Sequence, residues 1–182
     1  DGKSYLYWVE KNGKYLVVKD WKEGELYDYI DLYSLQYSSD SKNYSYIAIK
    51  DGKNLLVKDW IEGKLYDNIS SFKYSPDGKS YLYWVEKNGK YLVVKNWKEG
   101  ELYDYIDLDS LQYSSDSKIY WYIAEKDGKN LLVKDWIEGK LYDNISSFKY
   151  SLDSKSYSYI AIKDGKDLVV KDWKEGESYD FI

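Results

Sequence analysis

The sequence lacks several residue types on which most catalytic and metal sites depend. Its 182 residues include no Cys and no His, and Met, Arg and Thr are absent as well. Without Cys there is no disulfide framework, no thiolate metal site and no thiol nucleophile. Without His the usual general base is missing, and a Ser-His-Asp site is excluded. These absences predict a protein that is not an enzyme and that uses no metal or other cofactor.

Strong net charge and long apolar runs are also missing. The net charge is −5, with Lys residues interspersed among Asp and Glu. Nucleic acid is not an expected partner, because its recognition needs a basic face. We expect no membrane insertion, because no apolar run approaches transmembrane length and no signal-peptide pattern occurs. The chain begins at Asp1 rather than Met, so we expect a processed product or a fragment of a longer protein.

Aromatic residues and repetition are what the sequence does contain. Aromatic residues make up 19% of the chain, with 24 Tyr and 8 Trp. The segment VKDWKEGELYDYI, which begins at Val18, returns in four further close copies. The Trp residues of these copies follow one another at alternating spacings of 39 and 37 residues. They are Trp21, Trp60, Trp97, Trp136 and Trp173.

The repeats combine into a longer unit of 76 residues. Residues 1–76 match residues 77–152 except at six positions, and a third copy has begun where the sequence stops. This near identity indicates a recently amplified or designed repeat protein. We predict a single repeat domain over residues 1–182. Its repeats are expected at about 1–39, 40–76, 77–115, 116–152 and 153–182.

Each repeat has the pattern of short strands. Two apolar-aromatic runs flank Asn12-Gly13, and an Asn-Gly or Asp-Gly pair returns at the same place in every other repeat. Such pairs suit the type I′ turn of a two-residue hairpin. The next turn is predicted at DWKEG, with its Gly in a left-handed position of a longer loop. A third strand is predicted at LYDYI or LYDNI, and a fourth at SLQYSS or SFKYSP.

A four-stranded sheet that returns at this period is typical of a β-propeller. We therefore predict an all-β fold, a propeller of five four-stranded antiparallel blades. The alternating Tyr-x-Tyr pattern places tyrosines on one face of each sheet, where a neighbouring sheet is expected to cover them. The strand count leaves one blade without its inner strand. Three explanations are open: the fold tolerates the incomplete blade, two chains associate to complete it, or a longer parent protein supplies the missing strand.

One turn carries a family resemblance. The sequence SPDGK at 75–79, followed by an apolar strand and a turn, resembles the WD40-like PD40 repeat of TolB-type propellers. The other copies, SSDSK and SLDSK, match less well, and the Trp-Asp and Gly-His pairs of true WD40 repeats are missing. The resemblance implies a propeller fold. It also implies a protein-binding platform or, as in some such propellers, a substrate-gating domain of a peptidase.

The recurring Trp is the candidate binding feature. One interpretation is structural, with the indole packing across its own loop or onto the next blade. The other is that the ring stacks on a sugar or anchors a protein, through several identical sites acting together. We predict a non-enzymatic protein-interaction or structural scaffold, with a protein partner or self-association. The alternative is a multivalent, lectin-like propeller that binds glycans through Trp21 and its four equivalents.

Overall fold

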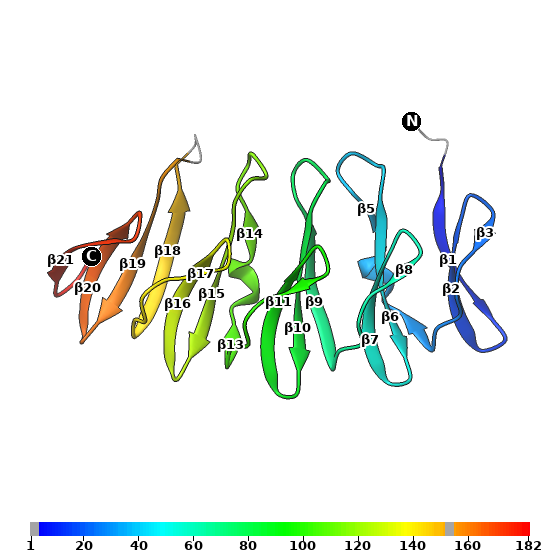
Figure 1. Cartoon of the computed structure of the whole chain (residues 1–182), viewed down its shortest axis with the longest axis horizontal. Coiled ribbons are helices and arrows are strands. Elements are labelled where there is room, and N and C mark those ends of the chain that lie inside the picture. The colour runs from blue at the N-terminus through cyan, green and yellow to red at the C-terminus, as the bar shows by residue number, and fades with distance from the viewer. Residues whose placement is uncertain (1–3, 152–154) are drawn as a thin grey trace. The chain divides into compact units, whose positions relative to one another are not determined.

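The structure is a computed structural model that describes residues 4–151 and 155–182 (Figure 1). These residues form five antiparallel sheets and two short 3₁₀ segments. The prediction of an all-β fold built from repeated antiparallel sheets is thus confirmed. Within the described ranges, no helix has the length and apolar character needed to cross a membrane.

The first sheet has three strands in the order β1-β2-β3, namely β1 (Leu6–Lys11), β2 (Lys14–Lys19) and β3 (Lys22–Glu23). The β1–β2 hairpin turns at Asn12 and Gly13, whose φ angles are 56° and 73°. Positive φ at both residues is the type I′ geometry predicted from the Asn-Gly pair. Among the described residues β1 pairs only with β2, so this is the sheet without an inner strand.

The other four sheets have four or five strands each. The second contains β4 (Tyr29–Ile30), β5 (Gln36–Tyr37), β6 (Tyr44–Lys50), β7 (Lys53–Lys58) and β8 (Ile61–Glu62). The third contains β9 (Asn68–Tyr74), β10 (Tyr81–Lys87), β11 (Lys90–Lys95) and β12 (Lys98–Glu99). The fourth contains β13 (Tyr105–Ile106), β14 (Gln112–Tyr113), β15 (Tyr120–Lys126), β16 (Lys129–Lys134) and β17 (Ile137–Glu138). The fifth contains β18 (Asn144–Tyr150), β19 (Tyr157–Lys163), β20 (Lys166–Lys171) and β21 (Lys174–Tyr179).

The segment predicted as a third strand, LYDYI, crosses from one sheet to the next. Tyr27 forms an isolated bridge with Tyr15 of the first sheet. Two residues later, Tyr29 pairs with Ile49 of β6 in the second sheet. The predicted single strand is therefore wrong, because the outer strand of the first sheet is β3, directly after the Trp. Each sheet after the first receives its inner strand from the preceding segment of the chain.

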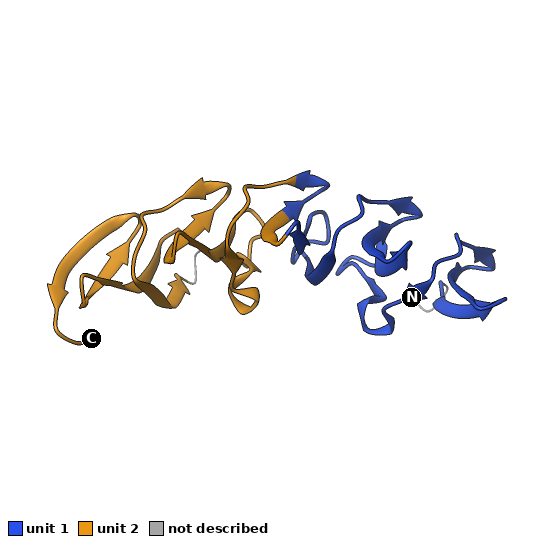
Figure 2. Cartoon of the chain, turned by 90° about the horizontal axis from the view of Figure 1, so that it is seen from below, with its two compact units in different colours: residues 1–88, 94–98 blue, residues 89–93, 99–182 orange. Residues whose placement is uncertain are grey.

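The chain divides into two compact units, residues 1–88 with 94–98 and residues 89–93 with 99–182 (Figure 2). In the first unit, a buried cluster joins the first two sheets. In the second unit, a buried cluster joins the fourth and fifth sheets. The first cluster contains Val17, Tyr27, Ile30, Tyr44, Tyr46, Ala48, Leu55 and Val57. The second contains Trp121, Ile123, Leu132, Tyr142, Ile145, Tyr157, Tyr159, Ala161, Leu168 and Val170.

Tyrosines dominate the contact between consecutive sheets. Tyr44 and Tyr46 of β6 are buried, as are Tyr157 and Tyr159 of β19. These are the alternating tyrosines for which the sequence predicted cover by a neighbouring sheet, and that prediction is confirmed at both places. Burial of large aromatic rings is a main source of stability in such packing.

Candidate functional site at the junctions between repeats

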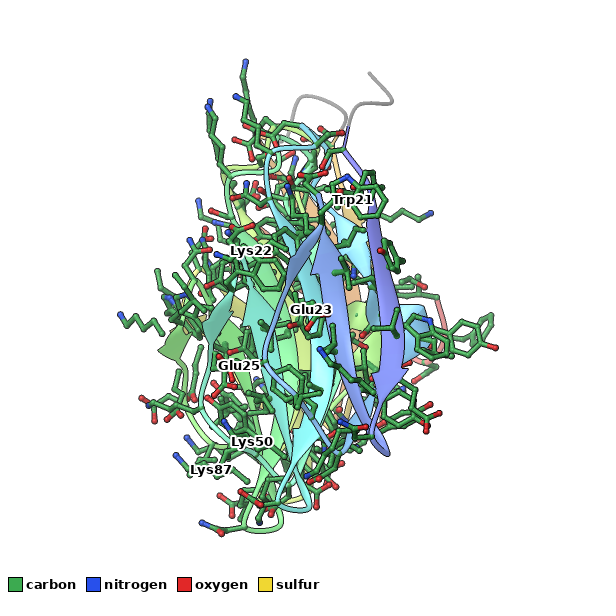
Figure 3. The ribbon with its side chains drawn as sticks, turned by 90° about the vertical axis from the view of Figure 1, so that its right-hand side faces the viewer. Trp21, Lys22, Glu23, Glu25, Lys50 and Lys87 are labelled. Carbon is green, nitrogen blue, oxygen red and sulfur yellow. The ribbon has the colours of Figure 1, made fainter. Side chains whose placement is uncertain are left out.

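The Trp of each repeat lies in a two-residue turn; Trp21, in the first of these turns, is labelled in Figure 3. Asp20 and Trp21 both have positive φ, at 49° and 67°, whereas Gly24 does not. The predicted longer loop with a left-handed Gly is therefore wrong. The other four Trp have φ of 67° or 68°. A bulky side chain in this region is strained by about 1–3 kcal/mol, so contacts elsewhere must hold it there.

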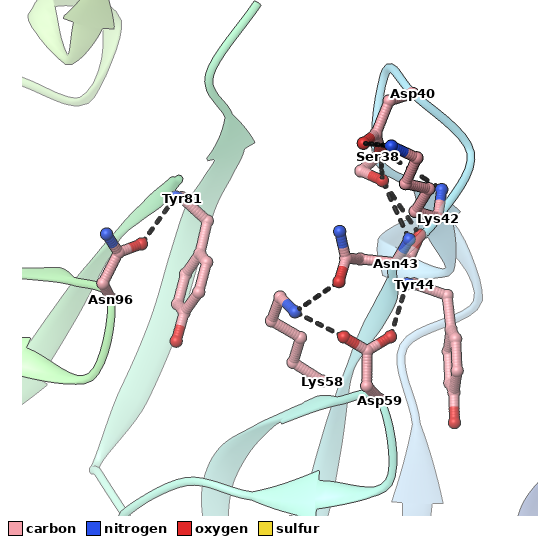
Figure 4. A network of polar contacts seen from close by, with 9 residues as sticks. All are labelled: Ser38, Asp40, Lys42, Asn43, Tyr44, Lys58, Asp59, Tyr81 and Asn96. Carbon is pink, nitrogen blue, oxygen red and sulfur yellow. Dashed lines mark hydrogen bonds and ion pairs between the residues drawn. The ribbon is translucent and has the colours of Figure 1, made fainter. Parts of the chain in front are cut away.

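The residue before the Trp fixes the turn to the first long strand of its own sheet. The Asp59 carboxylate accepts a hydrogen bond from the backbone N–H of Tyr44 at 3.0 Å (Figure 4). Asn96 replaces Asp in the third sheet, and its side-chain oxygen accepts the Tyr81 N–H at the same 3.0 Å. Because the Asn96 amide makes the same hydrogen bond as the Asp59 carboxylate, this bond between turn and strand requires an acceptor oxygen rather than a negative charge.

The indole ring then lies against the preceding repeat. A Cβ atom added to Gly63 would lie 2.5 Å from Cζ3 of Trp97, and one added to Gly139 would lie 2.5 Å from Cζ3 of Trp173. Neither glycine has a positive φ, so close approach of the ring, not backbone conformation, is what requires Gly there. The same contact joins Gly24 to Trp60 and Gly100 to Trp136.

In the second unit, a tyrosine and a glutamate complete the contacts between repeats. The ring of Tyr142 meets that of Tyr159 edge to face, with centroids 6.1 Å apart. Its hydroxyl donates to Glu175 Oε1 at 3.0 Å. Tyr103 makes the equivalent hydrogen bond to Glu138, also at 3.0 Å. Burial raises the pKa of Tyr103 and Tyr142, so both hydroxyls stay protonated and act as donors.

Lysines cover part of the aromatic surface. The Lys22 ammonium lies 5.4 Å from the centre of the Trp60 ring, within the range of a cation–π contact. In the second unit, Lys140 lies 3.2 Å from Glu175, and Lys163 lies 3.4 Å from it. Lys140 holds the pKa of Glu175 below its usual value. The Trp60 ring therefore lies between a cation and a glycine backbone, and at the Trp173 junction two lysines pair with the carboxylate of Glu175.

We call this arrangement the junction site, and hollows lie beside Trp60, Trp97 and Trp173. The hollow beside Trp97 has a volume of about 300 Å³ and is lined by Ile61, Glu62, Gly63, Lys64, Tyr66 and Tyr83. An equivalent hollow beside Trp173 is also about 300 Å³. The one beside Trp60 is smaller, at about 130 Å³. The two larger hollows have mostly apolar walls with a few charged groups, which suits an apolar side chain flanked by charge.

The structure separates the five predicted Trp residues into two groups. Trp60, Trp97, Trp136 and Trp173 are half-buried at junction sites, each against the glycine of the preceding repeat. Trp21 is 82% exposed. The role of these rings in binding an external ligand stays a prediction. Sequence reasoning missed the partner glycines and the Tyr–Glu pairs. Glycine recurring three residues after each Trp was the available signal, but it was assigned to the turn.

Groups able to hold a metal ion are not found in the described ranges, since no three Asp or Glu side chains gather there. Comparison with protein-family models gave no match, and comparison with curated proteins gave none.

Several solved structures are similar to this chain. TolB from Acinetobacter baumannii is 13% identical, with a TM-score of 0.47 over 98% of this chain and 53% of its own. A eukaryotic initiation factor is 12% identical, with a TM-score of 0.49 over 98% and 52% of the two chains. A putative TolB from Agrobacterium tumefaciens is 13% identical, with a TM-score of 0.44 over 95% and 76%. The chain spans about half the length of the first two structures.

Proposed function

We propose that the protein is a non-enzymatic scaffold that binds extended protein segments at its junction sites. The supporting observation is that the same hollow of about 300 Å³ occurs twice, beside Trp97 in one unit and beside Trp173 in the other, lined by identical residues 76 positions apart. A catalytic site needs different groups converging on one place, whereas identical sites in series suit multivalent binding.

The surface around the hollows has the composition of a protein-binding surface. Ile61 and Ile137 are 60% and 61% exposed at the mouths of the two larger hollows. Leu65 and Leu141 are exposed four residues further along. Exposed aliphatic residues beside an aromatic ring form an apolar centre with a charged rim, as in protein interfaces. A bound segment would place one apolar side chain in each hollow and its charges against the Lys and Glu of the rim.

A glycan ligand is the second candidate, and the exposure of Trp21 is what favours it. Sugar recognition by Trp requires an open ring face. At the inner junctions each ring lies against a glycine of the preceding repeat, and at Trp60 the Lys22 ammonium also lies over the ring. Trp21, at 82% exposure, is the ring of the five with the most open surface. A glycan-binding role would therefore depend on Trp21 rather than on all five.

A peptide-display library and a glycan array, probed with the same labelled chain, separate the two candidates. We expect selected peptides that carry an apolar residue flanked by charge. Their binding should fall at least tenfold in the double variant Ile61→Ser/Ile137→Ser. The control is Tyr33→Ser, which alters a side chain that is 99% exposed and lines neither hollow. Unchanged peptide binding in the Ile variant would reject the junction sites, and binding confined to glycans would favour the second candidate.

A further inference from the structure

The first sheet presents a Trp that has the junction geometry but no neighbour. The Tyr5 and Trp21 rings meet edge to face with centroids 5.1 Å apart, as Tyr44 and Trp60 do at 5.4 Å. The φ of Trp21 is 67°, against 68° for Trp60. Trp21 is nevertheless 82% exposed, whereas Trp60 is half-buried. By its backbone angle and its contact with Tyr5, the Trp21 ring (labelled in Figure 3) therefore has the orientation of its equivalents, which contact a glycine.

The fifth sheet presents the matching glycine without a Trp. Among the described residues, a Cβ atom on Gly176 would meet only the Val169 carbonyl oxygen, at 3.1 Å. The equivalent Gly139 meets the Leu132 carbonyl at the same 3.1 Å and, in addition, the Trp173 ring. Tyr179 is 51% exposed, although its equivalents Tyr27, Tyr66, Tyr103 and Tyr142 are all buried. The glycine and the tyrosine that receive a following repeat are thus both open here.

The same two sheets offer a matching pair of strand edges. In the second sheet, Tyr29 and Ile30 form β4 and pair with Ile49 and Ala48 of β6. Phe181 and Ile182 hold the positions of Tyr29 and Ile30 in the fifth repeat and are 88% and 42% exposed. At the positions of Ala48 and Ile49, β1 has Val9 and Glu10. Since β1 pairs only with β2 among the described residues, its other edge is open to an added strand.

The open surface of the first sheet around Trp21 and that of the fifth sheet around Gly176 form two faces, and their polar groups also correspond. At an inner junction, Tyr142 donates to Glu175 of the following repeat at 3.0 Å. In the first sheet, Glu23 stands at the position of Glu175, exposed on β3. A Tyr179 hydroxyl from another chain would find in Glu23 the acceptor that the inner tyrosines use. Lys174, at the position of Lys22, would lie over the Trp21 ring as Lys22 lies over Trp60.

We propose that two copies of this chain associate head to tail, with Trp21 of one copy seated on Gly176 of the next. A second copy is the occupant favoured by the structure, because ring, glycine, tyrosine, glutamate and strand edges all correspond to an interface that the chain already forms internally. The two faces differ from each other, so the contact is heterologous. Such contacts generate closed rings or open chains, not symmetric pairs.

Complementary variants test this assignment. Trp21→Ala removes the ring, and Gly176→Ala fills the site with a Cβ atom. Light scattering on a sizing column should show the unmodified chain growing in mass from micromolar to millimolar concentration. Each variant alone should stay at the monomer mass of 21.7 kDa. An equimolar mixture should give a species of twice that mass and nothing larger, because only one good interface remains between the two variants.

The control is Tyr33→Ala, which removes a ring that is 99% exposed and lies on neither face. It should associate as the unmodified chain does. Circular dichroism and melting temperature should show both interface variants folded, since neither side chain is buried in the isolated chain. An unmodified chain that stays monomeric up to millimolar concentration overturns the proposal. It is equally overturned if Trp21→Ala associates normally, or if the mixed variants remain monomeric.

Discussion

Replacing Gly139 by Ala should destabilise the fold through a single contact. The added Cβ atom would lie 2.5 Å from Cζ3 of Trp173, well inside van der Waals contact. Forcing an extra methyl group into a packed contact costs about 1–3 kcal/mol. Replacing Gly by Ala also restricts the unfolded chain, which raises the free energy of unfolding by about 0.4–1 kcal/mol. We therefore expect a net loss of about 1–2 kcal/mol in the free energy of unfolding.

Gly176→Ala is the matched control for this change. Both glycines face a carbonyl oxygen at 3.1 Å, but only Gly139 also faces an indole. Gly176→Ala should therefore be neutral or slightly stabilising. The two variants share the same residue change and the same repeat position. The difference between them measures the contact with the ring alone.

A double-mutant cycle makes the assignment to Trp173 explicit. Trp173→Ala removes a half-buried ring and should cost about 2 kcal/mol, roughly half the loss for a fully buried Trp. In Gly139→Ala/Trp173→Ala the new methyl group has space, so the double variant should be no less stable than Trp173→Ala. The expected coupling is about 1–2 kcal/mol, in the range seen for residues in contact.

Urea unfolding followed by circular dichroism, at low protein concentration, provides the assay. With a slope near 2 kcal/mol per molar, the expected loss lowers the midpoint of Gly139→Ala by roughly 0.5–1 M. An unchanged slope would show that the native state has lost stability and not compactness. If Gly139→Ala and Gly176→Ala unfold at the same midpoint, the glycine–Trp contact is not what requires glycine at this position.

Three further predictions concern charge, ionisation and exposure. The hydrogen bond from Lys90 lowers the pKa of Asp104. This pair should therefore stabilise the fold above about pH 4, and the stabilisation should be lost as the pH falls through the lowered pKa. In the variant Asp104→Asn, the free energy of unfolding should depend less on pH in this range. Burial raises the pKa of Tyr46 to about 12. Absorbance at alkaline pH should therefore show buried tyrosines ionising after exposed ones. The free energy of unfolding should fall above about pH 10, because the tyrosines of the unfolded chain ionise there first. Trp21→Ala should leave the monomer's melting temperature unchanged, whereas Trp60→Ala should cost about 2 kcal/mol.

The hairpin turns could be predicted because their cause is local. Asn12-Gly13 takes the type I′ geometry that its residue types favour. The SSDSK copies, although poorer matches to the PD40 pattern, form the same turn as SPDGK. The Ser38 hydroxyl donates to the Asp40 carboxylate at 2.7 Å (Figure 4). The Ser75 hydroxyl donates to Asp77 in the same way, also at 2.7 Å. Ser41, with φ of 58°, takes the left-handed position that Gly78 holds in the best match.

Packing of the Trp on an adjacent blade was one interpretation of the sequence, but the tight turn and the glycine partner could not be predicted, because their cause is not local. Trp has no intrinsic preference for positive φ, so neither residue type nor spacing predicts a tight turn at Asp20-Trp21. Gly63 likewise has an ordinary backbone, and its need to be Gly becomes visible only once Trp97 lies against it. The crossing of LYDYI between sheets was missed for the same reason, since its pairing partners belong to the following repeat.

The balance between strain in the turn and contacts of the ring gives a physical reason for the Trp that every repeat carries. Holding a Trp at positive φ costs about 1–3 kcal/mol. At Trp60 that cost is offset by burial of the ring against Gly24 and by the Lys22 contact. Trp21 has the same strained backbone with neither contact in the first sheet. Seating Trp21 on Gly176 of a second copy would supply a glycine contact and a lysine contact without any change in the turn. Association would therefore not have to order the Trp21 turn, because the turn is already formed in the single chain.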